Sequence, residues 1–285
     1  MSKKIAIITD STAGLPEAMT KAHGIYISHL MILFGNDSYQ EFKTITTEKF
    51  IELSAAQSEL PTTSQLSPGL TVEMYEKVLK DGYDEIIHIT LSSGLSGSYQ
   101  AAVSAAQMVE THKVHVFDSK TTSFPQGGLA IEATKLVKAG KNAEEIIQKL
   151  HEIRSTSGAF ATVKTLENLK KGGRLSNASA VIGGMLQIKP VITMSDAGTL
   201  DAISKVRTFN KAIQFLIDAA KDANLDESFE IAVMHVQNLE DVTALKDAIA
   251  KIYPKLKIHV IEISLVIAVH VGEGALGVSW LKVNK

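Results

Sequence analysis

The chain has 285 residues and a formal net charge of −2, from 29 Lys and Arg against 31 Asp and Glu, and no cysteine. This near balance, without a basic stripe, argues against nucleic acid as the main partner, and the lack of cysteine excludes disulfides, thiolate metal sites and cysteine nucleophiles. The longest nearly uncharged apolar stretch, 263–271, is far shorter than the ~20 residues of a membrane span. We expect a cytoplasmic protein of two domains.

The first half of the chain alternates strand-like and helix-like segments. Short apolar runs bounded by turn residues predict strands, and longer runs that follow a Thr, Ser or Pro predict helices. Such alternation is typical of a parallel sheet with helices on both faces. Strands are predicted at 5–9, 25–34, 85–91 and 114–117, a loop at 60–68, and helices at 15–23, 46–57, 67–81, 99–109 and 127–139.

The pattern changes after a predicted helix at 143–154. Residues 190–194 and 199–206 flank Ser195-Asp196-Ala197-Gly198, which predicts a hairpin. A hairpin among helices indicates an α+β second domain with a mixed sheet, and we expect domains at 1–157 and 158–285 with a ligand cleft between them. The other expected elements are strands at 159–163, 231–235, 258–263 and 278–283, and helices at 166–171, 210–223 and 239–251.

The most unusual stretch lies between the strand at 85–91 and the helix at 99–109. It holds four serines and two glycines within residues 92–98. A strand, a small polar loop and a helix N-terminus place free backbone N–H groups and a positive dipole end beside several hydroxyls. One serine is enough to cap a helix, so the number of hydroxyls favours a site for a carboxylate or a phosphate.

Two further positions are candidates for contact with a ligand. His270 stands among apolar residues, which is typical of a core histidine, but the glycine-rich turn 272–277 follows it. Arg174 follows Gly172-Gly173, which is typical of a helix end and also presents a guanidinium to an anion. From the residues alone both interpretations stay open for each.

Other motifs fail on their context. Residues 272–277 match G-x-G-x-x-G, but they neither open a helix nor leave room for the acidic residue that should follow, so no nicotinamide or flavin cofactor is expected. His112 and His115 have no carboxylate cluster beside them, and no metal is expected. Apolar residues that would suit a tunnel are more typical of a core; these are Met31, Phe34, Phe160, Met185 and Met194.

Taken in order, five motifs resemble the DegV family of bacterial fatty-acid-binding proteins over nearly the whole chain. They are Ile8-Thr9-Asp10-Ser11-Thr12, Pro61-Thr62-Thr63-Ser64-Gln65, residues 91–100, Leu169–Ser176 and His270–Gly277. The sequence departs from many relatives at Leu66 and Glu273, where those relatives carry proline.

The resemblance implies an N-terminal α/β/α domain, a C-terminal two-layer α/β domain and one acyl chain, such as palmitate, buried between them. It implies that Thr63 and Ser93 hold the fatty-acid carboxylate, with Ser64, Gly94, Ser96 and His270 beside them. It also implies that Arg174 and His270 support phosphoryl transfer by a partner, the ATP-binding subunit of a fatty acid kinase. The protein itself would be non-catalytic, without a cofactor, and would carry the acyl phosphate toward phospholipid synthesis, with a transient membrane contact for acyl exchange.

Two alternatives stay open. One is a serine hydrolase of acyl esters that uses Ser96 or Ser93 with His270, since Gly94-Leu95-Ser96-Gly97 is close to the G-x-S-x-G elbow. The other is a lipid-binding protein of the same fold that meets no kinase.

Overall fold

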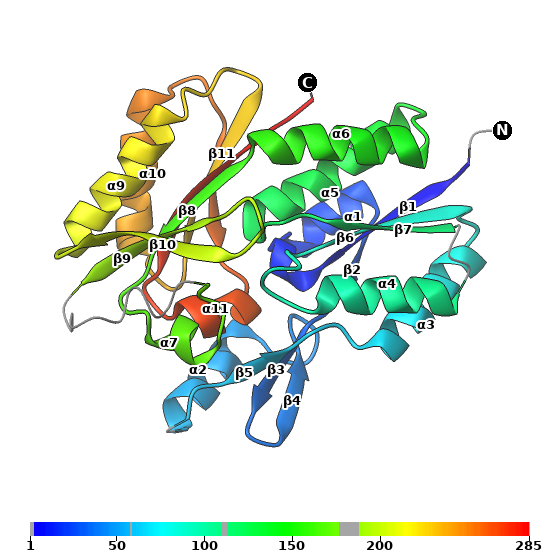
Figure 1. Ribbon diagram of the computed structural model, residues 1–285, viewed down its shortest axis with the longest axis horizontal. Helices are drawn as coiled ribbons and strands as arrows, with labels where there is room; N and C mark the ends of the chain where they lie inside the picture. Colours follow the sequence, from blue (N-terminus) through cyan, green and yellow to red (C-terminus); the bar gives the residue numbers. More distant parts are fainter. Residues whose placement is uncertain (1–2, 58, 110–112, 177–187, 285) are drawn as a thin grey trace. The chain divides into compact units, whose positions relative to one another are not determined.

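The computed structural model describes residues 3–57, 59–109, 113–176 and 188–284. The chain divides into two compact units, Met1–Ser155 and Thr156–Lys285. In Figure 1 the first unit runs from blue to green and the second from green to red.

Unit 1 is built on a four-stranded sheet. Its strands are β1 (Ile5–Asp10), β2 (Ile25–Ser28), β6 (Glu85–Thr90) and β7 (Val114–Asp118), in the order β2-β1-β6-β7. Every pair is parallel, as the alternation of strands and helices predicted. Parallel strands bring their carboxyl ends to one edge, so the loops after β1, β6 and β7 lie next to each other.

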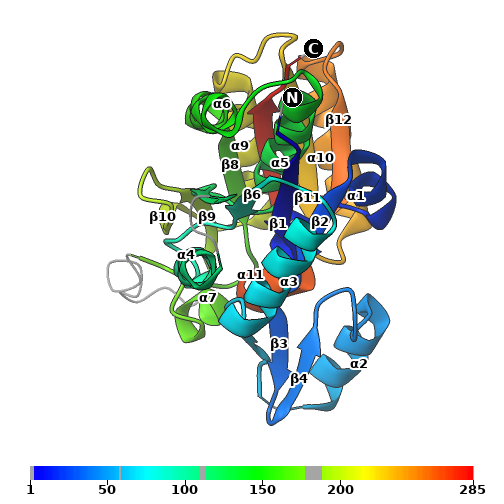
Figure 2. The ribbon, with the colours of Figure 1, turned by 90° about the vertical axis from the view of Figure 1, so that its right-hand side faces the viewer.

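Helices cover both faces of this sheet (Figure 2). On one face α3 (Pro68–Lys80) and α4 (Ser98–Met108) bury Tyr75 and Ala105 against Ile8. On the other face α5 (Ser123–Lys138) reaches the next residue of β1, where the Gln126 amide donates to the Thr9 hydroxyl at 3.1 Å. Adjacent residues of a strand face opposite sides, so this is the predicted α/β/α arrangement.

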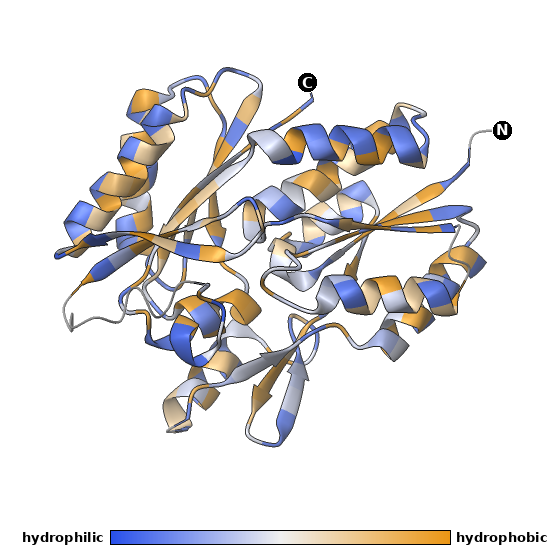
Figure 3. Ribbon diagram, in the orientation of Figure 1, coloured by the Kyte–Doolittle hydropathy of each residue, from blue (hydrophilic) through white to orange (hydrophobic). Residues whose placement is uncertain are grey.

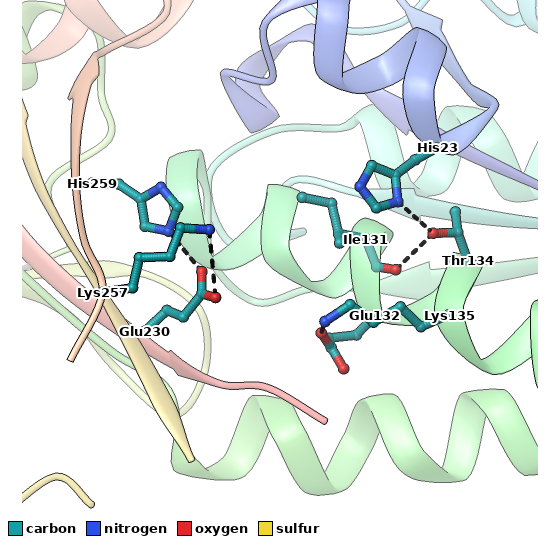
Figure 4. A network of polar contacts seen from close by, with 8 residues as sticks. All are labelled: His23, Ile131, Glu132, Thr134, Lys135, Glu230, Lys257 and His259. Carbon is teal, nitrogen blue, oxygen red and sulfur yellow. Dashed lines mark hydrogen bonds and ion pairs between the residues drawn. The ribbon is translucent and has the colours of Figure 1, made fainter. Parts of the chain in front are cut away.

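Two further helices of unit 1, α6 and α1, pack at the α5 side. The guanidinium of Arg154 on α6 (Ala143–Thr156) lies 5.2 Å from the centre of the Phe117 ring. On α1 (Glu17–His23), Nδ1 of His23 lies 3.1 Å from the Thr134 hydroxyl, which donates to the Ile131 carbonyl of α5 (Figure 4). Because that hydroxyl proton is already donated, His23 must be the donor in this pair.

A small antiparallel sheet completes unit 1, in the order β4-β3-β5. The sheet consists of β3 (Met31–Phe34), β4 (Asp37–Gln40) and β5 (Thr62–Ser64). Helix α2 (Thr47–Ala56) packs on this sheet through Phe50, whose ring centre is 5.8 Å from that of Phe34.

The sequence interpretation was wrong at three places in unit 1. The predicted strand at 25–34 is two strands, because Leu30 bonds to the Ser11 hydroxyl and to the Glu41 N–H instead of continuing a ladder. The predicted loop 60–68 contains β5, a short edge strand without the apolar alternation that signals one. Helix α5 begins at Ser123, not at 127, since Pro125 is tolerated in a first turn.

Unit 2 is a mixed six-stranded sheet in the order β10-β9-β8-β13-β11-β12, with β11 and β12 as its one parallel pair among the described strands. Helices α9 (Phe209–Asp222) and α10 (Leu239–Ile252) pack on one face, where Leu216 and Leu245 bury against Val233 and Val278. Figure 3 shows hydrophobic and hydrophilic residues alternating along α9, as expected for a helix with one buried face. The strands are β8 (Gly158–Thr162), β9 (Lys189–Met194), β10 (Leu200–Val206), β11 (Phe229–His235), β12 (Ile258–Glu262) and β13 (Leu276–Lys282).

The hairpin β9–β10 confirms the prediction at 190–206. Two features of unit 2 were not predicted. The apolar stretch before His270 is the helix α11 (Leu265–Val271), whose N-cap Ser264 accepts from the Ile267 N–H, and β13 lies inside the sheet, between β8 and β11.

A polar cluster joins the two parallel strands of unit 2 (Figure 4). Oε2 of Glu230 on β11 lies 2.6 Å from Nε2 of His259 on β12, and Oε1 lies 3.6 Å from Nζ of Lys257. Across the described part of the chain, no helix combines the length and the apolar character needed to cross a membrane.

Candidate functional site

The serine loop, residues 91–98, connects the end of β6 to the start of α4 and rests on a buried acid. Asp10 is fully buried at the end of β1, and its Oδ2 accepts the Leu91 N–H at 2.7 Å. Its Oδ1 lies 2.5 Å from the Thr12 hydroxyl. Burial raises the pKa of Asp10, although the hydrogen bonds from Thr12, Gln126 and Leu91 act in the opposite direction. Asp10 of the Asp-Ser-Thr motif thus fixes the first residue of the serine loop.

Hydrogen bonds between residues close in sequence hold the serine loop in a compact turn. The Gly94 N–H donates to the Ser92 hydroxyl at 3.1 Å, and the Ser96 N–H to the Ser92 carbonyl at 3.2 Å. The hydroxyls of Ser96 and Ser98 lie 2.9 Å apart, and the Ser98 N–H donates to the Ser96 oxygen at 3.2 Å. The loop is therefore a compact turn of polar groups at the N-terminus of α4, a helix long enough to carry a dipole.

The Thr-Ser-Gln segment lies directly against this loop. The Leu66 N–H donates to the Ser98 hydroxyl at 3.1 Å, and a methyl group added at Gly97 would come within 1.9 Å of Oε1 of Gln65. Thr63 is half-buried in β5, paired with Ile32, whereas Ser64 is exposed and its hydroxyl donates to the Gln65 carbonyl at 3.3 Å. The two motifs predicted to hold one ligand are thus neighbours within unit 1.

Ser93, the central predicted ligand residue, is already engaged by its own chain. Its hydroxyl donates to Oδ2 of Asp118 at 2.6 Å, and its N–H donates to Oδ1 at 3.1 Å. Sequence reasoning missed Asp118 as part of the site, because Asp is common at strand ends. The signal was available: Asp118 ends β7, the neighbour of β6, and is in register with Thr90.

The other two predicted residues meet in unit 2, where α7 (Glu167–Lys171) packs against α11. A methyl group at Gly172 would lie 2.5 Å from Nδ1 of His270, and the Asn168 amide donates to the Val269 carbonyl at 3.1 Å. Burial, with the Arg174 charge as a second cause, lowers the pKa of His270 to about 4. His270 is therefore neutral at pH 7, beside a permanent cation.

The geometry does not favour the hydrolase alternative. The hydroxyl of Ser93 bonds to Asp118 and that of Ser96 to Ser98, so neither pairs with a histidine among the residues that the structure describes. Within the same part of the chain no three His, Asp or Glu side chains gather as a metal site would require, and His112 and Met185 lie outside it.

A cavity of about 520 Å³ lies at the opposite edge of the parallel sheet in unit 1. It is lined by Ile5 and Glu85, which begin β1 and β6, together with Lys3, His115 and residues 140–144. The serine loop follows the other end of β6, so this cavity is no part of the candidate site.

Comparison with known proteins agrees with the family resemblance. Residues 4–283 match the profile of the DegV family of uncharacterised proteins. A DegV domain-containing protein of Halalkalibacterium halodurans is 37% identical over 278 residues, covering 97% of this chain and 98% of that protein.

Two solved structures have the same fold over essentially the whole chain. The fatty acid binding DegV family protein of Streptococcus agalactiae has a TM-score of 0.91 at 32% identity, with 99% of this chain and 100% of that one covered. DegV of Bacillus subtilis, a fatty acid binding protein, has a TM-score of 0.88 at 36% identity, with 99% and 100% covered. With its fold, its motifs and these relatives in agreement, the chain belongs to the DegV family.

Proposed function

We propose that this protein binds a long-chain fatty acid and holds its carboxylate at the serine loop and the Thr63 segment. The observation that carries the proposal is the contact between these two motifs, in which Leu66 and Gln65 meet Ser98 and Gly97. Hydroxyl and N–H donors grouped at a helix N-terminus stabilise a carboxylate. The ligand set we propose comprises Thr63, Ser64, Ser93, Gly94, Ser96 and His270.

The relatives support the same ligand class. The proteins of S. agalactiae and B. subtilis named above are both fatty acid binding, at 32% and 36% identity to this chain. Burial of an acyl chain contributes about 0.8 kcal/mol per CH₂, so a long tail supplies most of the affinity and the polar loop selects the head group. That the tail lies between the two units stays a prediction.

We further propose that the protein is non-catalytic and presents the acyl chain to a fatty acid kinase. Arg174 and His270 are the residues assigned to this step, because the guanidinium is a permanent anion ligand and lies beside a histidine that is neutral at pH 7. The kinase would supply ATP, and the product would be an acyl phosphate.

The ligand is tested on the whole protein, purified from a bacterial host. The protein is denatured and extracted with organic solvent, and the extract is analysed by mass spectrometry. We expect a stoichiometric long-chain fatty acid such as palmitate. No lipid in the extract, and none taken up on incubation, would remove the carboxylate assignment.

The head-group site is tested by titration with a fluorescent fatty acid. Ser93→Ala and Thr63→Ala each remove one hydroxyl. We expect roughly a tenfold loss of affinity from each, which equals about 1.4 kcal/mol of binding free energy and lies near the lower end of the range for a hydrogen bond to a charged group. Ser155→Ala is the matched control, since its hydroxyl only caps the exposed end of α6.

The kinase step is tested separately with Arg174→Ala. We expect fatty acid binding to persist while phosphorylation by an added fatty acid kinase falls at least tenfold. Unchanged phosphorylation would remove Arg174 from the step without touching the binding proposal.

A further inference from the structure

Asp118 stands where the proposed ligand should bind. Its carboxylate accepts both the hydroxyl of Ser93, at 2.6 Å, and the N–H of the same residue, at 3.1 Å. These are the two donors of the residue assigned to the fatty-acid carboxylate. A carboxylate of the chain itself therefore accepts the two donors that are assigned to the carboxylate of the ligand.

The chain holds the Asp118 carboxylate in this position. Oδ1 also accepts the Lys120 N–H at 3.0 Å, in a turn in which Lys120 has a φ of +52°. The Asp118 carbonyl accepts from the Arg154 guanidinium at 2.6 Å. The backbone after Asp118 is joined to the end of β6 and to the serine loop, since the Ser119 N–H donates to the Thr90 carbonyl and the Ser92 N–H to the Thr121 carbonyl. Moving the carboxylate away would break its bonds from Ser93 and from the Lys120 N–H.

A hydroxyl carries a single proton, so Ser93 donates either to Asp118 or to a ligand. Two carboxylates at one hydroxyl also repel each other. Lys120 follows Asp118 in the same turn, and Arg154 on α6 donates to the backbone carbonyl of Asp118.

We propose that Asp118 is a specificity-determining residue that competes with the fatty-acid carboxylate for Ser93 and so limits the affinity for an anionic head group. The inference rests on the proposed function and concerns the same site. Its consequence is a binder that holds its ligand mainly by the tail and releases the head group readily. A carrier that must hand its acid to a partner needs that property.

The variant Asp118→Asn separates the competition from a merely structural role. An asparagine oxygen placed at Oδ1 keeps the N–H bonds from Ser93 and Lys120. Its amide then donates to the Ser93 oxygen, which frees the hydroxyl proton for the ligand. Asp118→Ala is the second variant, which removes the charge without adding a donor. Asp81→Asn is the control, because Asp81 has a single exposed ion pair with Lys77.

Each variant is titrated with a long-chain fatty acid and with the fatty alcohol of the same chain length. We expect Asp118→Asn to bind the acid at least about tenfold more tightly than the wild type, because a like charge has been removed, while alcohol binding stays within about twofold. Denaturant midpoints show which variants are folded. An equal change for acid and alcohol, or no gain for the acid in either folded variant, would overturn the inference. A wild-type protein that binds neither ligand would instead overturn the proposed function.

Discussion

The serine loop of unit 1 and the corner around Arg174 in unit 2 differ in the charge of the groups that they offer to a ligand. The loop is made of neutral donors, most of them already bonded within the loop or to Asp118. The corner holds a permanent cation next to a histidine that burial keeps neutral. Neutral donors recognise a carboxylate without a strong field, whereas a guanidinium suits the higher charge of a phosphoryl group. Under the proposed function, the carboxylate is bound mainly by neutral donors of unit 1, the cation of unit 2 supports phosphoryl transfer, and His270 is assigned to both.

The largest effect is expected at the base of the serine loop. Asp10→Ala would leave the buried N–H groups of Leu91 and Thr12 without their acceptor, so we expect a loss of about 3 kcal/mol in the free energy of unfolding. Urea denaturation measures it. Asp10→Asn retains part of the bonding and should lose less; equal losses would mean that the hydrogen bonds at Asp10 are unimportant.

The pH dependence of the unfolding free energy, compared between the wild type and Asp10→Asn, gives a sharper test. Asp10 has an ordinary pKa of 3.8, raised in the folded protein, so above pH 3.8 the unfolded chain is ionised while the native one keeps its proton. The native state therefore loses stability as the pH rises from 3.8 to the folded pKa, and the loss is constant beyond it. Since Asp10→Asn has no such proton, wild-type stability relative to this variant should fall as the pH rises above 3.8 and become constant once the pH exceeds the folded pKa.

The next largest effect is expected in the corner of unit 2. A valine at Gly172 would place Cβ 2.5 Å from His270 Nδ1 and 3.1 Å from the Asn168 carbonyl oxygen, so His270 must move. We expect a cost of about 1–3 kcal/mol in unfolding free energy. Gly173→Val is a useful comparison: nothing lies within 4 Å of its Cβ, and its cost comes from a positive φ of 69°. If only Gly172→Val impairs kinase-coupled phosphorylation, the contact with His270 is what the step requires.

The charge state of His270 gives a smaller effect. Its pKa falls from 6.5 to about 4, so native stability is lost as the pH decreases below 6.5, where the unfolded histidine is protonated and the native one is not. Arg174→Ala removes the second cause and should raise the pKa of His270, which burial still keeps below 6.5. Imidazole NMR titration measures this directly. An unchanged pKa would mean that the two side chains do not interact electrostatically.

The smallest effect on stability is expected at Gly97. Alanine there would collide with Oε1 of Gln65 at 1.9 Å, but a flexible side-chain end can move aside, so we expect less than about 1 kcal/mol. Fatty acid affinity should nevertheless fall, because Gln65 belongs to the segment that carries Thr63. A variant with normal affinity would show that the packing of the two motifs is not needed for binding.

Elements were predicted correctly where the residue pattern of the segment itself, such as an apolar run or a turn sequence, determines the structure. The alternation of strands and helices predicted the parallel sheet, and Ser195–Gly198 predicted the β9–β10 hairpin. The sequence did not predict β5, whose residues are polar and whose strand exists only because β3 is there to pair with it. Asp118 was missed because Asp is common at strand ends, and its role depends on the pairing of β7 with β6, which brings it next to Ser93.

The bond from Leu66 to Ser98 joins residues 32 positions apart and makes two motifs one structural element. A slip of β5 by one residue along β3 would disturb this element, since the side chains of a strand alternate between faces. Thr63 would then exchange sides with its neighbours, and the Leu66 N–H would lose Ser98. The proposed head-group site therefore depends on the register of a three-residue strand.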